Sequence, residues 1–186
     1  MKKERCMLFF DIDGTLITTD GKRTFPESAK RALREARERG HLVYINTGRV
    51  MANVDEFIRD VGFDGYVCGC GTYIISEGRE LLHNRVSQDR CREIAYKCRD
   101  CRMMAIFEHT EHTAYDPVLE AEDEEYREIL SYFKSMERNV ISDIEDPDFC
   151  FDKFACWYDE GNPKLQEFID YMSQDFTCIQ REGNFL

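Results

Sequence analysis

The chain lacks any long hydrophobic run. None of its apolar stretches approaches the roughly 20 consecutive residues that a helix needs to cross a bilayer. The charged N-terminal residues are followed by only the short apolar run Cys6 to Phe10, which is too short for the apolar region of a signal peptide. Repeats and low-complexity segments are also absent. We therefore expect a cytoplasmic protein rather than a membrane or secreted one.

Positive charge is scarce. The 186 residues contain 25 Lys and Arg against 37 Asp and Glu, a formal net charge of −12. Nucleic acids and anionic membranes repel such a surface, so neither is expected as a partner. Apolar residues make up 42% of the chain and aromatic residues 12%, which is ample for a folded core and argues against disorder. The length predicts one or two domains.

Cysteine is plentiful, with nine in the chain. The pairs Cys68-x-Cys70 and Cys98-x-x-Cys101 could bind a metal or act in redox chemistry, with His109 and His112 as further ligands. Their spacings match known zinc sites poorly. Buried thiols in a reducing compartment explain them more simply, and a structural thiol or zinc protein stays open as an alternative.

Two carboxylates follow the first apolar run. Asp11 and Asp13 lie two residues apart at the end of this predicted strand, so their side chains point the same way. Gly14 permits a tight turn after them, and Thr15 can hydrogen-bond in that turn. Ligands of open α/β sheets bind at this end of the strands. One acid there can attack as a nucleophile while the other moves protons, with a divalent cation offsetting their charge.

The first eighty or so residues alternate predicted strands and helices in the order β-α-β-α-β, which implies a parallel sheet with right-handed crossovers. The predicted strands span 5–11, 41–47 and 65–69, and the predicted helices span 26–40 and 50–62. A hairpin is predicted from 72–75 and 80–82 around Glu77-Gly78.

The pattern changes near residue 84 to a mixture of helices and strands that indicates an α+β module. Helices are predicted at 87–100, 120–136 and 163–172, and strands at 103–108, 113–115, 149–158 and 176–180. We therefore expect two domains, 1–83 and 84–186.

A second motif ends the second strand, where Thr47, Gly48 and Arg49 follow the apolar run 41–46. Together with Asp11-Ile12-Asp13-Gly14-Thr15, this motif resembles the haloacid dehalogenase (HAD) superfamily of phosphotransferases. The Thr-Gly-Arg form is similar to the Cof-type subfamily with a class IIB cap. The resemblance implies a Rossmann-like α/β core with an inserted α+β cap.

The resemblance also implies a reaction. Asp11 would be phosphorylated by a small phosphorylated metabolite, and Asp13 would act as general acid and then as general base. Thr47 and Gly48 would hold the phosphoryl group. Mg²⁺ would be the cofactor, held by Asp11 and Asp13. Arg49 would contact the phosphate, although it could equally be a solvated residue at a helix start. The cap would supply the contacts that decide the substrate.

The chain departs from the family after the cap. Members of the family continue into a lysine and a Gly-Asp-x-x-Asn-Asp segment, but no Gly-Asp pair occurs in this sequence. We therefore expect an incomplete core, either because the chain is a fragment or because a partner completes its sheet. The strand 7–10 would then lie on an open edge that favours self-association. A non-catalytic binding module is the main alternative to a phosphatase.

Overall fold

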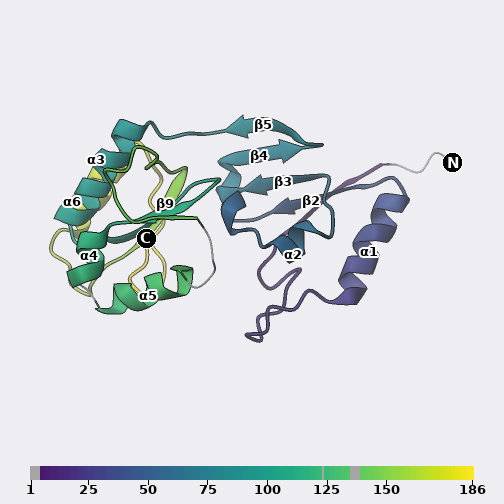
Figure 1. Ribbon diagram of the computed structural model, residues 1–186, viewed down its shortest axis with the longest axis horizontal. Coiled ribbons are helices and arrows are strands. Elements are labelled where there is room, and N and C mark those ends of the chain that lie inside the picture. Colours follow the sequence, from purple (N-terminus) through teal and green to yellow (C-terminus); the bar gives the residue numbers. More distant parts are fainter. Residues whose placement is uncertain (1–4, 123, 135–138) are drawn as a thin grey trace. The chain divides into compact units, whose positions relative to one another are not determined.

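The computed structural model describes residues 5–122, 124–134 and 139–186 (Figure 1). The chain divides into two compact units, one that ends at Asn84 and one that begins at Arg85. Each unit has its own sheet and its own buried core. No helix among the described residues combines the length and the apolar character that crossing a membrane requires.

The first unit is built on a five-stranded sheet in the order β1-β2-β3-β4-β5. The first three strands are parallel neighbours, and the last two add an antiparallel hairpin. Glu77 and Gly78 have φ of +50° and +75°, the left-handed pair that a tight hairpin turn requires. The strands are β1 (Met7–Phe10), β2 (Leu42–Asn46), β3 (Gly65–Cys68), β4 (Tyr73–Ser76) and β5 (Arg79–His83).

Helix α1 (Glu27–Glu38) begins directly after Pro26, as the sequence predicts. Its buried Leu33 packs in one cluster with Val43 and Ile45 of β2. Val43 and Ile45 lie two residues apart, so their side chains point to the same face of the sheet. This is the face that α1 covers. Figure 1 shows α1 as the long helix of this unit.

The predicted helix 50–62 is wrong. The structure has a 3₁₀ turn η1 (Met51–Asn53) and a single helical turn α2 (Glu56–Arg59). Val54 and Asp55 between them are extended, with ψ of 111° and 146°. The carboxylate of Asp55 accepts hydrogen bonds from two arginines, and these bonds fix the extended segment against the helical preference.

β1 is an edge strand of this sheet among the described residues. Its Met7 and Phe9 side chains are 54% and 50% exposed, although both are large and apolar. The Phe9 ring packs against the Tyr44 ring, with the ring centroids 5.2 Å apart. The first unit therefore presents an apolar strand with an unpaired side.

The second unit has a four-stranded sheet in the order β8-β7-β6-β9, in which β7 and β8 are parallel and the other pairs antiparallel. Its central strand β6 is buried on both faces. Phe107 faces a cluster with helices α3 and α6, while Ile106 faces a cluster with α4 and α5. The strands are β6 (Met104–Glu108), β7 (Thr113–Tyr115), β8 (Val140–Ile141) and β9 (Lys153–Trp157), and the helices are α3 (Gln88–Asp100), α4 (Pro117–Glu122), α5 (Glu124–Lys134) and α6 (Leu165–Met172).

Three predicted elements of this unit differ from the structure, two in their extent and one because it does not form. The predicted helix 120–136 begins earlier, as two helices, and its residues 135–136 lie outside the described part. The strand predicted at 149–158 begins only at Lys153, because Phe149 and Phe151 sit in a loop whose rings fill the core. The strand predicted at 176–180 does not form. Instead Leu186 exchanges hydrogen bonds with Cys156 of β9, at 2.8 and 2.9 Å.

Candidate active site

The first two strands bring both sequence motifs to one edge of the sheet. Phe10 of β1 lies opposite Ile45 of β2 in a parallel register, so the two strands end side by side. Asp11 follows β1 directly, and Thr47 follows β2 after its last residue, Asn46. This is the carboxyl end of a parallel sheet, where ligands of such sheets bind.

A tight turn keeps the side chains of Asp11 and Asp13 on the surface while Ile12 enters the core. Ile12, between them, is fully buried, and its carbonyl oxygen accepts hydrogen bonds from the N–H groups of Leu16 and Ile17, both at 3.0 Å. Gly14 adopts a φ of +76°, which a residue with a side chain rarely takes. Asp11 and Asp13 are consequently both exposed on either side of the Ile12 anchor.

Thr47 is fixed by its backbone. Its N–H donates to the carbonyl oxygen of Val67 on β3 at 2.9 Å, and Thr47 as a whole is only 4% exposed. The Thr47 hydroxyl oxygen accepts the N–H of Arg49 at 3.2 Å. Gly48 between them is exposed, so the backbone at this point is open to a ligand. The Thr47 hydroxyl therefore has a defined position just after the carboxyl end of β2.

Arg49 connects the two motifs. Its guanidinium binds both carboxylate oxygens of Asp13, with Nε 2.8 Å from Oδ2 and Nη2 on Oδ1. Nη1 reaches Oδ2 of Asp55 at 2.9 Å, and Arg23 binds the same oxygen at 2.5 Å. Burial alone would lower the pKa of Arg49, but the bonds to Asp13 and Asp55 outweigh it and raise that pKa.

The two aspartates of the first motif thus differ in their surroundings. Arg49 holds the Asp13 carboxylate by two parallel hydrogen bonds, a geometry that fixes direction as well as distance. The Asp11 carboxylate is exposed and has no ion pair among the described residues. Asp11 is open to a ligand, whereas Asp13 is positioned by the protein. The phosphate-binding role of Arg49 stays a prediction.

Sequence reasoning missed Asp55 and Arg23. Asp55 lies in a stretch whose apolar spacing predicts a helix, where an acid is expected on the solvent side. Arg23 lies in an irregular loop with a φ of +49°. Neither position has a local pattern that marks it, because their link to Arg49 exists only once the loops have folded together.

Replacing Arg49 with Met is expected to lower the free energy of unfolding by about 1–3 kcal/mol. The substitution leaves Asp13 and Asp55 without the cation that bridges them, and Arg49 is the more buried member of both pairs, with 18% of its side chain exposed. Urea denaturation followed by circular dichroism would measure the change. Arg39→Met is the matched control, because its side chain is 65% exposed and it should alter stability little. Equal effects of both substitutions would contradict the bridging role.

The oxygen donors at this edge fit a hard cation such as Mg²⁺. The exposed Asp11 carboxylate offers one ligand. The bonds that close the turn run from Gly14 N–H to the Ile17 oxygen and from Ile17 N–H to the Ile12 oxygen, so neither uses the Asp13 carbonyl. That carbonyl offers a second ligand. The Asp13 carboxylate is bound to Arg49, so Asp13 would reach the metal through its carbonyl rather than its carboxylate.

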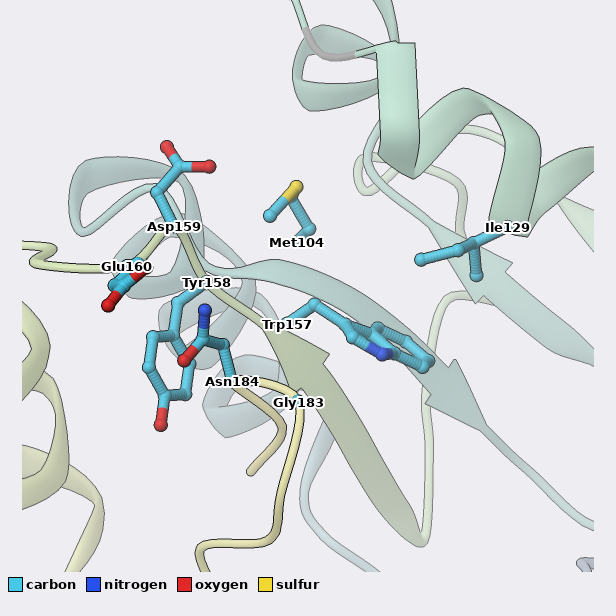
Figure 2. A pocket seen from close by; sticks show the side chains of 8 residues that line it. All are labelled: Met104, Ile129, Trp157, Tyr158, Asp159, Glu160, Gly183 and Asn184. Carbon is cyan, nitrogen blue, oxygen red and sulfur yellow. The ribbon is translucent and has the colours of Figure 1, made fainter.

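The second unit carries a separate pocket of about 250 Å³. Figure 2 shows the Trp157 ring at one end, directed toward Ile129, and Asp159 with Glu160 at the other. Asn184 lies near Tyr158 in the same view. The two carboxylates in its lining disfavour an anionic ligand.

The buried members of the two cysteine pairs are poorly suited to redox chemistry. Burial raises the pKa of the Cys68 thiol to about 12, and it raises the pKa of Cys98 as well. A thiol that stays protonated at neutral pH is a poor nucleophile and a poor redox group. Cys98 and Cys101 are fully buried among apolar side chains and contribute to packing of the second core.

Comparisons with known proteins agree on the fold. Residues 8–186 match the model of the haloacid dehalogenase-like hydrolase family. A hypothetical protein from Geobacillus kaustophilus HTA426 has a similar structure, with a TM-score of 0.76 and 19% identity over 98% of this chain and 68% of that chain. The subclass IIB sugar phosphatase BT4131 superimposes with a TM-score of 0.63 and 20% identity, over 90% of this chain and 63% of that chain.

A curated relative is similar in sequence. YkrA of Bacillus subtilis (strain 168), whose name proposes a phosphatase activity, is 25% identical over 101 residues. The match covers 54% of this chain, and the chain spans only 38% of the length of that relative. The family match extends over nearly the whole chain and includes both motifs at the carboxyl edge of the sheet. The chain therefore belongs to the haloacid dehalogenase-like hydrolase family.

Proposed function

We propose that the protein is a Mg²⁺-dependent phosphatase that hydrolyses small phosphorylated metabolites through an aspartyl-phosphate on Asp11. The observation that carries the proposal is the contrast between the two aspartates of the first motif. Asp11 is exposed, whereas Asp13 is held by two hydrogen bonds from Arg49. A nucleophile must be open to its substrate, and a general acid–base group must be positioned beside it.

The reaction proceeds in two displacements. A carboxylate oxygen of Asp11 attacks phosphorus, and the bond to the leaving oxygen breaks. Asp13 enters this step in its protonated form, outside its ion pair with Arg49, and gives the leaving oxygen that proton. Asp13 then accepts a proton from water as the water attacks phosphorus, the bond to Asp11 breaks, and inorganic phosphate leaves. Arg49 binds the Asp13 carboxylate that the first step leaves and so orients it for the second step. The Thr47 hydroxyl would donate to a phosphoryl oxygen.

Mg²⁺ would be held by the Asp11 carboxylate and the Asp13 carbonyl. The ion would offset the negative charge of the phosphoryl group, which otherwise repels the anionic nucleophile. Because the protein contributes mainly positioning and electrostatics to phosphoryl transfer, activity should depend steeply on this cation.

The experiment that tests the proposal is hydrolysis of an aryl phosphate by the 186-residue chain, with Mg²⁺ and with EDTA. Activity that requires Mg²⁺ supports the phosphatase. A folded chain that shows no activity at saturating Mg²⁺ contradicts it and favours the alternative, a non-catalytic binding module. Binding of inorganic phosphate or vanadate without turnover would be its signature.

We also propose that the edge strand β1 pairs with a second chain, because its Met7 and Phe9 are exposed and its outer side is open among the described residues. Sedimentation equilibrium would test this, and a monomer at all concentrations would count against it. A cytoplasmic location is proposed from the cysteines, none of which is in a disulfide.

A further inference from the structure

A second cluster of potential ligands lies in the second unit, away from both motifs in the sequence. His109 and His112 bracket the tight turn between β6 and β7, which the His109 N–H closes on the His112 carbonyl oxygen at 2.9 Å. Their rings face each other, with centroids 4.6 Å apart. Cys150 approaches from the loop before β9, between the buried Phe149 and Phe151. Two segments about forty residues apart thus supply two imidazoles and a thiol.

The three residues are close enough to share one ion. One ligand atom from each lies within 4.8 Å of the others. Zinc bonds to nitrogen and sulfur are about 2.0–2.3 Å long, so ligands of one tetrahedral zinc lie roughly 3.5 Å apart. Closing the cluster therefore needs only a small rotation of side chains. His109 and Cys150 are half-buried, which leaves room for that adjustment.

The buried imidazole makes the kind of hydrogen bond that supports a metal ligand. His112 is 5% exposed, and its Nε2 lies 2.9 Å from the Cys150 carbonyl oxygen. A carbonyl oxygen can only accept, so Nε2 carries a proton, and in the neutral imidazole Nδ1 keeps its lone pair. Histidines that bind metals commonly donate their other N–H to a backbone carbonyl in this way. Here the carbonyl belongs to the residue that supplies the thiol.

A hydrogen bond to the second imidazole can give way to a metal ion. The N–H of Glu111 lies 3.3 Å from Nδ1 of His109, a long hydrogen bond that coordination of that nitrogen would replace. The cluster lines a pocket of about 710 Å³ whose wall also carries the carboxylates of Glu111 and Asp148. These charges favour a cation in the pocket, and one of them or a water molecule can complete a fourth position.

We propose that His109, His112 and Cys150 form a binding site for a divalent transition-metal ion, with Zn²⁺ as the best fit. Two nitrogens and a thiolate suit zinc, whereas the oxygen donors around Asp11 suit Mg²⁺. Binding releases the thiol proton of Cys150 as the sulfur–zinc bond forms. The ion would tie the β6–β7 turn to the loop that leads into β9 and so stabilise the second unit. This site is independent of the proposed phosphatase chemistry.

The test is titration of the reduced, full chain with Zn²⁺ against a chromophoric chelator, together with Co²⁺ substitution. One tight equivalent is expected, and the Co²⁺ form should show the charge-transfer absorption of a cobalt–thiolate bond. Cys150→Ser should abolish that absorption and weaken binding by at least about 100-fold, and His109→Gln should weaken binding comparably. Cys178→Ser is the matched control, since Cys178 is similarly half-buried in the same unit and lies outside the cluster.

The outcomes separate cleanly. Loss of the tight equivalent in Cys150→Ser and in His109→Gln, with Cys178→Ser unchanged, supports the site. Absence of tight Zn²⁺ binding by the parent chain, or undiminished binding by both cluster variants, overturns it. Circular dichroism without metal establishes that the variants fold. His109→Gln keeps the experiment decisive where Cys150→Ser does not fold, because His109 lies in a surface turn.

Discussion

Replacing Asp11 with Asn is expected to lower kcat for aryl phosphate hydrolysis by about 10⁴-fold or more. The amide keeps the size and hydrogen-bonding shape of the carboxylate but cannot attack phosphorus. Asp11 is exposed and does not fill the core, so the substitution should leave the fold intact. Steady-state kinetics at saturating Mg²⁺ would measure the loss, and a thermal melt would establish that the variant folds.

Asp60→Asn is the matched control for this substitution. Asp60 is an exposed aspartate of the same unit, at the end of α2. Its replacement removes the same charge and should leave kcat within about twofold, as surface substitutions away from a site usually do. Turnover by Asp11→Asn at the parent rate would eliminate Asp11 as the nucleophile, whatever the control shows. Asp11→Ala excludes a trace of activity caused by deamidation.

Replacing Asp13 with Asn is expected to reduce turnover by about 10²–10⁴-fold, the usual contribution of a positioned general acid–base group. The substitution should lower the rates of the two displacements unequally. An aryl phosphate with a good leaving group needs little protonation, so the first displacement continues. Hydrolysis of the aspartyl-phosphate needs Asp13 to take a proton from water, so this step slows most. A burst of about one equivalent of phenol followed by a slow phase is the expected trace.

The burst distinguishes loss of proton transfer by Asp13 from a structural disturbance of the site. Loss of the Arg49 ion pair alone would disturb the site and slow both steps together. Arg49→Met provides that comparison, because it removes the same ion pair and keeps the Asp13 carboxylate. A uniform loss without a burst in Asp13→Asn, equal to the loss in Arg49→Met, would show that Asp13 is structural rather than catalytic.

The sequence predicts the sheet of the first unit well because its signals are local. The predicted strand 41–47 has the continuous apolar run Leu42 to Ile45 at its centre, and a strand buried in a parallel sheet needs such a run. The hairpin around Glu77-Gly78 follows from turn chemistry, and helix α1 from Pro26 and its apolar spacing. The edge position of β1, expected from the resemblance, also agrees with the sheet order.

Features that depend on contacts between distant residues could not be predicted. The stretch 50–62 has helical spacing, yet Arg23 and Arg49 bind Asp55 and hold the segment extended. Likewise, the sequence offers His109 and His112 only as further ligands for the pairs Cys68-x-Cys70 and Cys98-x-x-Cys101, at poorly matching spacings. The fold brings Cys150 to them instead. In both cases the deciding partner lies on another segment and leaves no periodic trace in the chain.

The measurement that tests the central claim most directly is the site of covalent phosphorylation. The Asp13→Asn variant is incubated with Mg²⁺ and an activated aryl phosphate, quenched in acid and analysed by intact mass and peptide mapping. The account predicts one phosphoryl group per chain, on the peptide that contains Asp11, and none when Asp11 is also replaced. A phosphoryl group on another residue, or turnover by the parent chain without any covalent intermediate in the variant, would contradict it.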